Sequence, residues 1–262
     1  MTNLNINNLT FDEPIIYRDL NIYPVRLRDY YAFYGYADCF LTDKNSIPDA
    51  KVISMKELEY LHYITQKEKS EKPYIYFFDR ILSLCLRDND SFENPQKSIV
   101  RFYLYKDLHN PYFLINNKKY YDSDYKNIKR IICMQNLVDL PDENISKDVR
   151  DSLENALSYK NKSDENPATL EDYIISLSVV TGWKLEYIYE MSIRKFIKSV
   201  RRFDHYMHYK IFMSASMSGM VEFKDKSVIK SWLSGLEKKD KYKDVSLGLE
   251  EFRRKLSLED AK

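Results

Sequence analysis

The most regular stretch of the chain is residues 192–219, which read SIRKFIKSVRRFDHYMHYKIFMSASMSG. Its apolar residues recur at helical spacing and so share one face of an α-helix. These residues are Ile193, Phe196, Ile197, Val200, Phe203, Met207 and Ile211. Ser192 is a good N-cap, and Gly219 is typical of a helix end. The stretch therefore predicts one long amphipathic helix.

The rest of the C-terminal third favours helices too. All 8 prolines lie at or before Pro167, so helices after it can run without interruption. Thr169 and Asp172 have the spacing of a capping box, and Gly182 is suited to the left-handed end of that helix. A short helix is expected over 185–190. We predict an all-helical domain over residues 161–262.

The first part of the chain mixes strands with helices. Apolar residues around the Arg18-Asp19 step predict one β-hairpin, and residues 98–121 predict a second that turns at Asn116-Asn117, because Asn tolerates positive φ. Helices are expected over 27–40, 74–86 and 123–136. Another helix is expected after Ser54, which forms a capping-box pattern with Glu57.

An amphipathic segment over 145–157 precedes the most polar stretch of the chain, KNKSDENP at 160–167. We place the domain boundary in that stretch. The predicted fold class is therefore α+β and mainly helical. It has an α+β domain with two small β-hairpins over residues 1–160 and a helical, partner-binding domain over 161–262.

Composition excludes several classes of function. The net charge is +1, so no global field attracts nucleic acid or a membrane. Only 5 glycines are present, and no two lie within a dozen residues of each other, so phosphate-binding loops and a nucleophile elbow are not expected. The sequence predicts a protein that is not an enzyme and has no cofactor. An enzyme with an unrecognised carboxylate site remains a second alternative.

The cysteines and histidines also favour structural roles. Cys39, Cys85 and Cys133 stand apart in apolar runs, which indicates buried free thiols in a reducing compartment. His205 and His208 share a helix face, but this spacing alone is weak, and we predict no metal site. No signal peptide or membrane-spanning run is visible, so an intracellular location is expected.

The best surface feature is the basic face of the helix after Ser192. Six Lys or Arg residues against one Asp give residues 192–210 a charge of +5. The face carries Arg194, Lys195, Lys198, Arg201, Arg202, His205 and Lys210. A solvated or ion-paired surface is the first interpretation of this face, and a contact with a protein partner is the second. Nucleic-acid binding is the third, and it is considered because short helices precede this one, as in a helix–turn–helix.

A second surface feature follows in the same helix. Met213, Met217 and Met220 alternate with small Ser and Ala residues. Methionine packs adaptably, and small residues allow another helix to approach closely. A helix contact inside the domain and a plastic groove for a client protein both fit this composition.

Two stretches carry a resemblance to a known group of proteins. One is TLEDYIISLSVVTGWKLEYIYEMSIRKFIKSVRRFDHYMHYKIFMSASMSGMVEFKDKSVIKSWLSGL at 169–236, and the other is FDEPIIYRDLNIYPVRLRDYY with IPDAKVISMKELEYL, at 11–31 and 47–61. They resemble uncharacterised proteins in the tail-gene clusters of phages and prophages of low-GC Gram-positive bacteria. The resemblance implies a tail-assembly chaperone or a baseplate-hub assembly protein, and it carries no catalytic motif.

The leading hypothesis is therefore a phage tail structural or assembly protein that acts by protein–protein binding. Its expected partners are tail proteins, either a tape measure or a hub protein, together with a second copy of itself. The expected binding residues are Arg194, Lys195, Lys198, Arg201, Arg202, His205, Met213, Met217 and Met220. The first alternative is a nucleic-acid-binding regulator that uses the basic helix at 192–210. The expected location is then the host cytoplasm, and retention in the virion tail is a further expectation.

Overall fold

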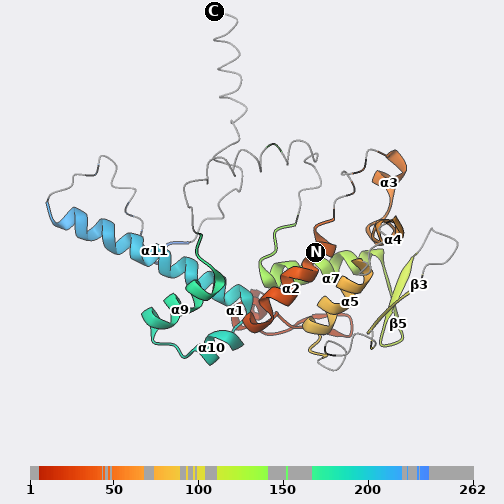
Figure 1. Ribbon diagram of the computed structural model, residues 1–262, viewed down its shortest axis with the longest axis horizontal. Helices are drawn as coiled ribbons and strands as arrows, with labels where there is room; N and C mark the ends of the chain where they lie inside the picture. The colour runs from red at the N-terminus through yellow and green to blue at the C-terminus, as the bar shows by residue number, and fades with distance from the viewer. Residues whose placement is uncertain are drawn as a thin grey trace, which may run out of the picture. The chain divides into compact units, whose positions relative to one another are not determined.

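The computed structural model describes residues 6–42, 44, 47, 49–67, 74–88, 93, 97, 99–103, 111–140, 152, 167–219, 223, 229 and 231–235. The chain divides into two compact units. The first comprises Met1–Asp142 and Ile174–Arg201, and the second comprises Glu143–Tyr173 and Arg202–Lys262. Figure 1 shows the helices and strands along the chain.

The N-terminal hairpin forms where the sequence predicts it. Strands β1 (Ile15–Tyr17) and β2 (Leu20–Ile22) pair antiparallel, with Ile15 opposite Ile22. The turn places Arg18 at φ 53°, a left-handed conformation that is costly for a long side chain. Side-chain contacts of Arg18 hold it there, as described below.

Helices fill most of the chain between the two hairpins. They are the 3-10 helix η1 (Leu27–Asp29), α2 (Tyr30–Ala37), the 3-10 helix η2 (Asp38–Phe40), α3 (Ala50–Ser54), α4 (Glu57–Lys67) and α5 (Tyr74–Cys85), whereas α1 (Ile6–Phe11) precedes the first hairpin. Helix α5 is almost wholly buried, including the pair Asp79 and Arg80. The Asp79 carboxylate accepts a hydrogen bond from the Val100 N–H at 2.8 Å, which fixes the start of strand β3 (Val100–Tyr103) against this helix.

The predicted capping box at Ser54 and Glu57 is wrong. Ser54 is the last residue of α3, and its hydroxyl donates to the Lys51 carbonyl at 2.8 Å. At the start of α4, the Leu58 N–H donates to the Asp122 carboxylate at 2.8 Å. In the predicted box Ser54 would accept the Glu57 N–H; in the structure a residue far away in sequence, Asp122, accepts the next N–H of the helix start, that of Leu58.

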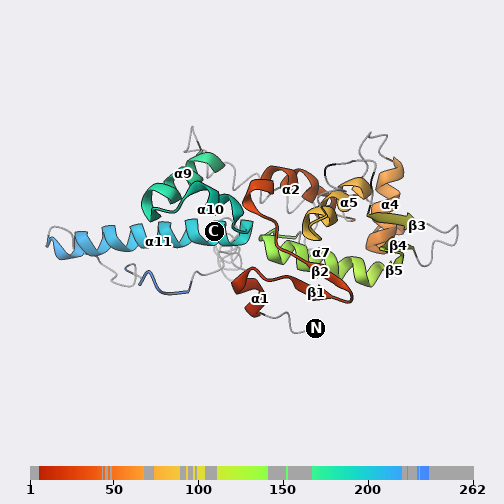
Figure 2. The ribbon, with the colours of Figure 1, turned by 90° about the horizontal axis from the view of Figure 1, so that it is seen from below.

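The second hairpin is part of a three-stranded antiparallel sheet. Its order is β3-β4-β5, with β4 at Tyr112–Ile115 and β5 at Lys118–Tyr121. Asn116 and Asn117 have φ values of 51° and 61°, as the predicted tight turn requires. Helix α7 (Asp122–Asn136) follows directly, and Figure 2 shows the β1–β2 hairpin running beside it.

The C-terminal helices confirm the predicted caps. They are α9 (Leu170–Thr181), α10 (Leu185–Glu190) and α11 (Ile193–Met217). Thr169 and Asp172 exchange hydrogen bonds at the start of α9, and Gly182 ends that helix at φ 71°. The Ser192 hydroxyl accepts the Lys195 N–H at 3.1 Å, and Gly219 follows α11 at φ 68°. The fold class is α+β and mainly helical, as predicted.

One hydrophobic core holds the first unit together. It contains Ile22, Phe33, Phe78 and Ile132, and it also contains Ile193 from the start of α11. The beginning of α11 thus packs with the N-terminal elements. The predicted boundary at 160–167 and the amphipathic segment at 145–157 lie almost entirely outside the described residues.

Candidate protein-interaction surface

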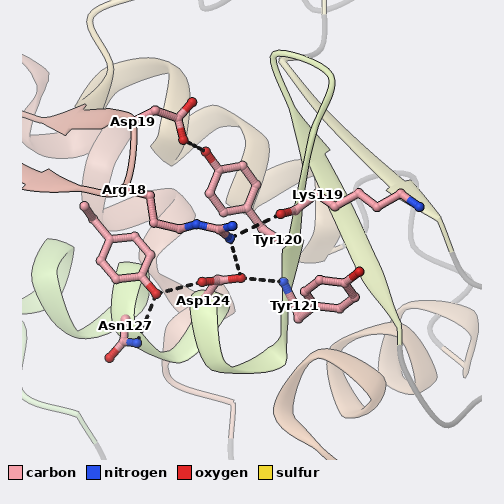
Figure 3. A network of polar contacts seen from close by, with 8 residues as sticks. Arg18, Asp19, Lys119, Tyr120, Tyr121, Asp124 and Asn127 are labelled. Carbon is pink, nitrogen blue, oxygen red and sulfur yellow. Dashed lines mark hydrogen bonds and ion pairs between the residues drawn. The ribbon is translucent and has the colours of Figure 1, made fainter.

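A cluster of polar side chains in the first unit surrounds Asp124, in the first turn of α7. Its carboxylate accepts hydrogen bonds from the Tyr17 hydroxyl at 2.8 Å, the Arg18 guanidinium at 2.9 Å and the Tyr121 N–H at 2.8 Å. Asn127 donates to the Tyr17 hydroxyl at 3.1 Å. Figure 3 shows these groups converging from the first hairpin, β5 and α7.

A second carboxylate completes the cluster. Asp19 accepts a hydrogen bond from the Tyr120 hydroxyl at 2.6 Å and pairs with Lys118 at 2.7 Å. Hydrogen bonding from Lys118 and Tyr120 lowers the pKa of Asp19. The Arg18 guanidinium lies 5.0 Å from the centre of the Tyr120 ring. Both carboxylates therefore already have hydrogen-bond partners. The cluster joins the first hairpin to the second, and we assign the cluster a structural role.

The segment before α11 is joined to the first unit through the backbone. The Leu27 N–H donates to the Met191 carbonyl at 2.9 Å, and the Ile193 N–H donates to the Val25 carbonyl at 3.0 Å. Glu190, at the end of α10, pairs with Arg26 and with Arg28, each at 2.7 Å. These contacts fix α10 and its exposed side chains in place.

The first turn of α11 is anchored by Asp12. The Ser192 hydroxyl donates to the Asp12 carboxylate at 2.7 Å, and Lys195 lies 3.8 Å from the same carboxylate. Arg194 donates to the Met134 carbonyl at 2.8 Å, and burial lowers its pKa. Two of the residues predicted to bind a partner, Arg194 and Lys195, therefore contact the N-terminal elements of the same unit.

Lys198 and Arg201 occupy the next turns and are exposed. Partial burial of the Lys198 ammonium and the positive charge of Arg194 lower the pKa of Lys198. Within the described ranges neither residue has an ion-pair partner. They are the part of the predicted basic face that stays available in the first unit.

Within the second unit, the turn at 231–235 lies against α11. Arg202 donates to the carbonyls of Trp232 at 2.6 Å and Ser234 at 2.8 Å. The His205 ring nitrogen lies 3.2 Å from the Ser231 carbonyl oxygen. Two more predicted binding residues thus bind their own chain, which leaves fewer cations for phosphate contacts than the sequence suggests.

The predicted methionine surface is only partly described. Met213 is half-buried, Met217 is 80% exposed, and Met220 lies outside the described residues. Of the apolar stripe on α11, Ile193 and Phe196 are buried, whereas Ile211 is 59% exposed. The apolar face therefore changes from core to surface along the helix.

A larger exposed apolar surface lies on α9 and α10, where the sequence analysis did not place a site. Of the 21 residues in Leu170–Glu190, only Ile174, Leu177 and Ile188 are buried. The exposed large apolar residues are Tyr173, Ile175, Val179, Val180, Trp183, Leu185, Tyr187 and Tyr189. Val179 alone is 78% exposed. We name the seven of these residues that belong to the first unit, from Ile175 to Tyr189, the α9–α10 surface.

The sequence signal for this surface is that α9 reads LEDYIISLSVVT. It is apolar on every face after its first turn, and such a helix normally has neighbours on all sides. Large exposed apolar patches mark interaction sites in soluble proteins. The sequence of α9 resembles that of a core helix. Its outer face can be recognised as a candidate site only from the fold, which leaves that face uncovered.

Comparison with known proteins finds a family match in the C-terminal part of the chain. Residues 160–237 match the family model described as the YomV second domain. YomV is a protein of Bacillus phages and prophages, so the match is consistent with a phage protein of low-GC Gram-positive bacteria. No curated protein and no solved structure matches the chain.

Two further findings concern the part of the chain that the structure describes. None of its helices is long and apolar enough to cross a membrane. Its described residues also contain no group of three or more His, Cys, Asp or Glu side chains arranged to hold a metal ion.

Proposed function

We propose that this protein is a phage assembly protein that acts by binding other proteins, and that the α9–α10 surface is its main contact. The observation that carries the proposal is that this exposed apolar surface lies inside the residues that match the YomV second domain. Burial of apolar area is the dominant favourable contribution to protein association. Exposed aromatic residues such as Trp183 and Tyr187 are enriched at the energetic centres of interfaces.

The rigid attachment of α10 supports the same proposal. Its exposed rings are held by the backbone pairing of 25–27 with 191–193 and by the Glu190 ion pairs. Trp183 and Tyr187 also pack edge to face, with ring centres 5.4 Å apart. A surface that is already ordered loses little conformational entropy when a partner binds.

Tail assembly is the specific role that we propose. It is supported by the resemblance of residues 11–31, 47–61 and 169–236 to proteins of phage tail-gene clusters. The partner would be a tail protein, such as a tape measure or a hub protein, bound while the tail is built. The protein would act without catalysis or cofactor.

The test is co-expression with the products of the neighbouring genes, followed by purification through a tag on this protein. We expect a tail protein to co-purify with the native chain and to be lost with Val179→Asp. Ile53→Asp is the matched control, because Ile53 is an exposed residue of α3, 47% accessible, away from the α9–α10 surface. Co-purification unaffected by Val179→Asp, or normal tails from a phage that lacks the gene, would refute the proposal.

A further inference from the structure

The three-stranded sheet of the first unit has one face in the core and one face turned to solvent. Phe113, Ile115 and Tyr120 are 0% exposed, whereas the residues that alternate with them are exposed or half-buried. The solvent-facing residues of the sheet whose side chains the structure describes are Arg101, Tyr112, Leu114, Lys119 and Tyr121. We name these five residues the outer sheet face. They comprise two cations, two tyrosine rings and one aliphatic side chain, and none of the five is acidic.

The register of the strands gathers these rings and cations. Tyr112 lies opposite Tyr121, and their ring centres are 6.2 Å apart. Leu114 is the partner of Arg101 on β3 and of Lys119 on β5. Directly opposed residues of antiparallel strands place their side chains on the same face. The tyrosine pair and the row that carries both cations are therefore neighbouring rows of one surface.

The β5 side of the outer sheet face projects into solvent. Tyr121 is 44% exposed, and Figure 3 shows its ring and the Lys119 side chain extending away from the Asp124 cluster. The Lys119 ammonium lies 4.7 Å from the centre of the Tyr112 ring. A cation–π contact at an exposed site is weak, so the ammonium can exchange it for a contact with an anion.

This combination of groups fits one class of ligand. Aromatic rings stack on unpaired bases, and a β-sheet face is a common platform for such stacking. Cations beside the rings contact the phosphates that link successive bases. An apolar protein partner would leave both cations without a counter-charge, and an acidic one would leave the rings unused. Rings and cations together are complementary to a single-stranded nucleic acid.

We infer that the outer sheet face binds single-stranded nucleic acid, with Tyr121 as the main stacking platform. On binding, Lys119 leaves the Tyr112 ring for a phosphate, and Tyr112 takes the neighbouring base. Arg101, in the same row as Lys119, contacts another phosphate. This activity goes beyond the proposed function, because it uses other residues of the first unit and another class of ligand.

The first experiment is fluorescence anisotropy of the full chain with labelled oligomers of about twelve nucleotides. Deoxythymidine and uridine oligomers are compared, which separates DNA from RNA as the ligand. At ~50 mM salt we expect a Kd of about 1–100 μM for at least one of them. Tyr121→Ala should raise that Kd at least about fivefold, the lower end of the contribution of one base–aromatic stack, whereas Tyr121→Phe should leave it unchanged. Binding of neither oligomer below ~100 μM, or equal binding by Tyr121→Ala, overturns the inference.

The second experiment measures how the Kd depends on salt. For single strands, the logarithm of the affinity falls with the logarithm of the salt concentration by about 0.7 for each phosphate contact. Lys119→Ala should therefore make this slope shallower by about 0.7. The matched control is Lys51→Ala, which removes an exposed cation of α3 and should leave the slope unchanged. A slope that changes with Lys198→Ala and not with Lys119→Ala would assign the contact to the basic face of α11 and overturn the inference.

The two proposals fail separately. Val179→Asp should leave oligomer binding unchanged, and Tyr121→Ala should leave the co-purification of a tail protein unchanged. A chain that keeps its tail partner and binds no oligomer would remove the nucleic-acid site and leave the proposed function intact. A chain that binds oligomers through Tyr121 but has no tail partner would do the reverse.

Discussion

Replacing Ser192 by Ala tests how α11 is attached to the first unit. Ser192 is 4% exposed, caps α11 through the Lys195 N–H, and donates to Asp12 at 2.7 Å. Loss of a serine N-cap costs about 1 kcal/mol. Loss of a hydrogen bond to a charged group costs about 1.5–3 kcal/mol. The Asp12 side chain is 22% exposed, so water can solvate its carboxylate once the Ser192 hydroxyl is gone. We therefore expect Ser192→Ala to lower the free energy of unfolding by an amount at the lower end of the summed range, about 2–3 kcal/mol.

The assay is urea unfolding followed by tryptophan fluorescence. The chain has 2 tryptophans, so a Trp232→Phe background leaves Trp183 as a reporter of the first unit. With a slope of about 1–3 kcal/mol per molar urea, the midpoint should fall by roughly 1 M. Ser214→Ala is the control, because Ser214 is exposed on α11; it should change stability by no more than about 0.5 kcal/mol.

A double-mutant cycle separates the Asp12 hydrogen bond from the cap. Asp12 has φ 59°, so Asp12→Gly removes the carboxylate without straining the backbone. We expect a coupling energy of about 1–2 kcal/mol between this change and Ser192→Ala. A loss below about 0.5 kcal/mol for Ser192→Ala, or fully additive effects of the two changes, would contradict the reasoning.

Three further predictions follow from buried or engaged groups. All 3 cysteines are buried, and burial raises the pKa of Cys133 to about 12. A disulfide reagent at pH 8 should therefore label no cysteine in the native protein and all three in urea. Rapid labelling of the native protein would contradict this. The pKa of Asp19 is lowered in the folded state, so the ionised Asp19 carboxylate stabilises the fold fully when the pH is above the usual aspartate pKa of ~4. This stabilisation is lost as the pH falls through the lowered pKa of the folded state. Asp19→Asn should therefore flatten the acid side of the stability profile, and an unchanged profile would show that its ion pair contributes nothing. Asp124→Asn should destabilise the chain by about 1–3 kcal/mol in thermal unfolding, because it weakens three hydrogen bonds, whereas Asp204→Asn, 71% exposed, should stay within about 0.5 kcal/mol.

Much of the fold could be predicted because its signals are local. The caps at Thr169 and Ser192 join groups three residues apart, and the turn at Asn116-Asn117 depends on the conformations of two residues. Such interactions form between neighbours in the chain, whatever surrounds them. The prediction failed at Ser54, where Asp122 satisfies the helix start instead.

The candidate site was less predictable. The basic face at 192–210 is a correct reading of helical spacing, but spacing does not show which cations already have partners. Arg194 meets the Met134 carbonyl and Arg202 meets the Trp232 carbonyl, and both acceptors lie far away in sequence. Whether the predicted partner-binding residues bind a partner stays a prediction.

The sequence by itself determined most of the helices and strands, the caps at Thr169, Gly182 and Ser192, and which helix faces are apolar or basic. Only the tertiary structure decided which of those faces are covered. Helix α9 shows the difference: it is apolar on every side after its first turn, and the folded chain buries Ile174 and Leu177 but leaves Val179 exposed. Helical periodicity depends on residues within one or two turns, whereas burial depends on elements packed from distant parts of the chain.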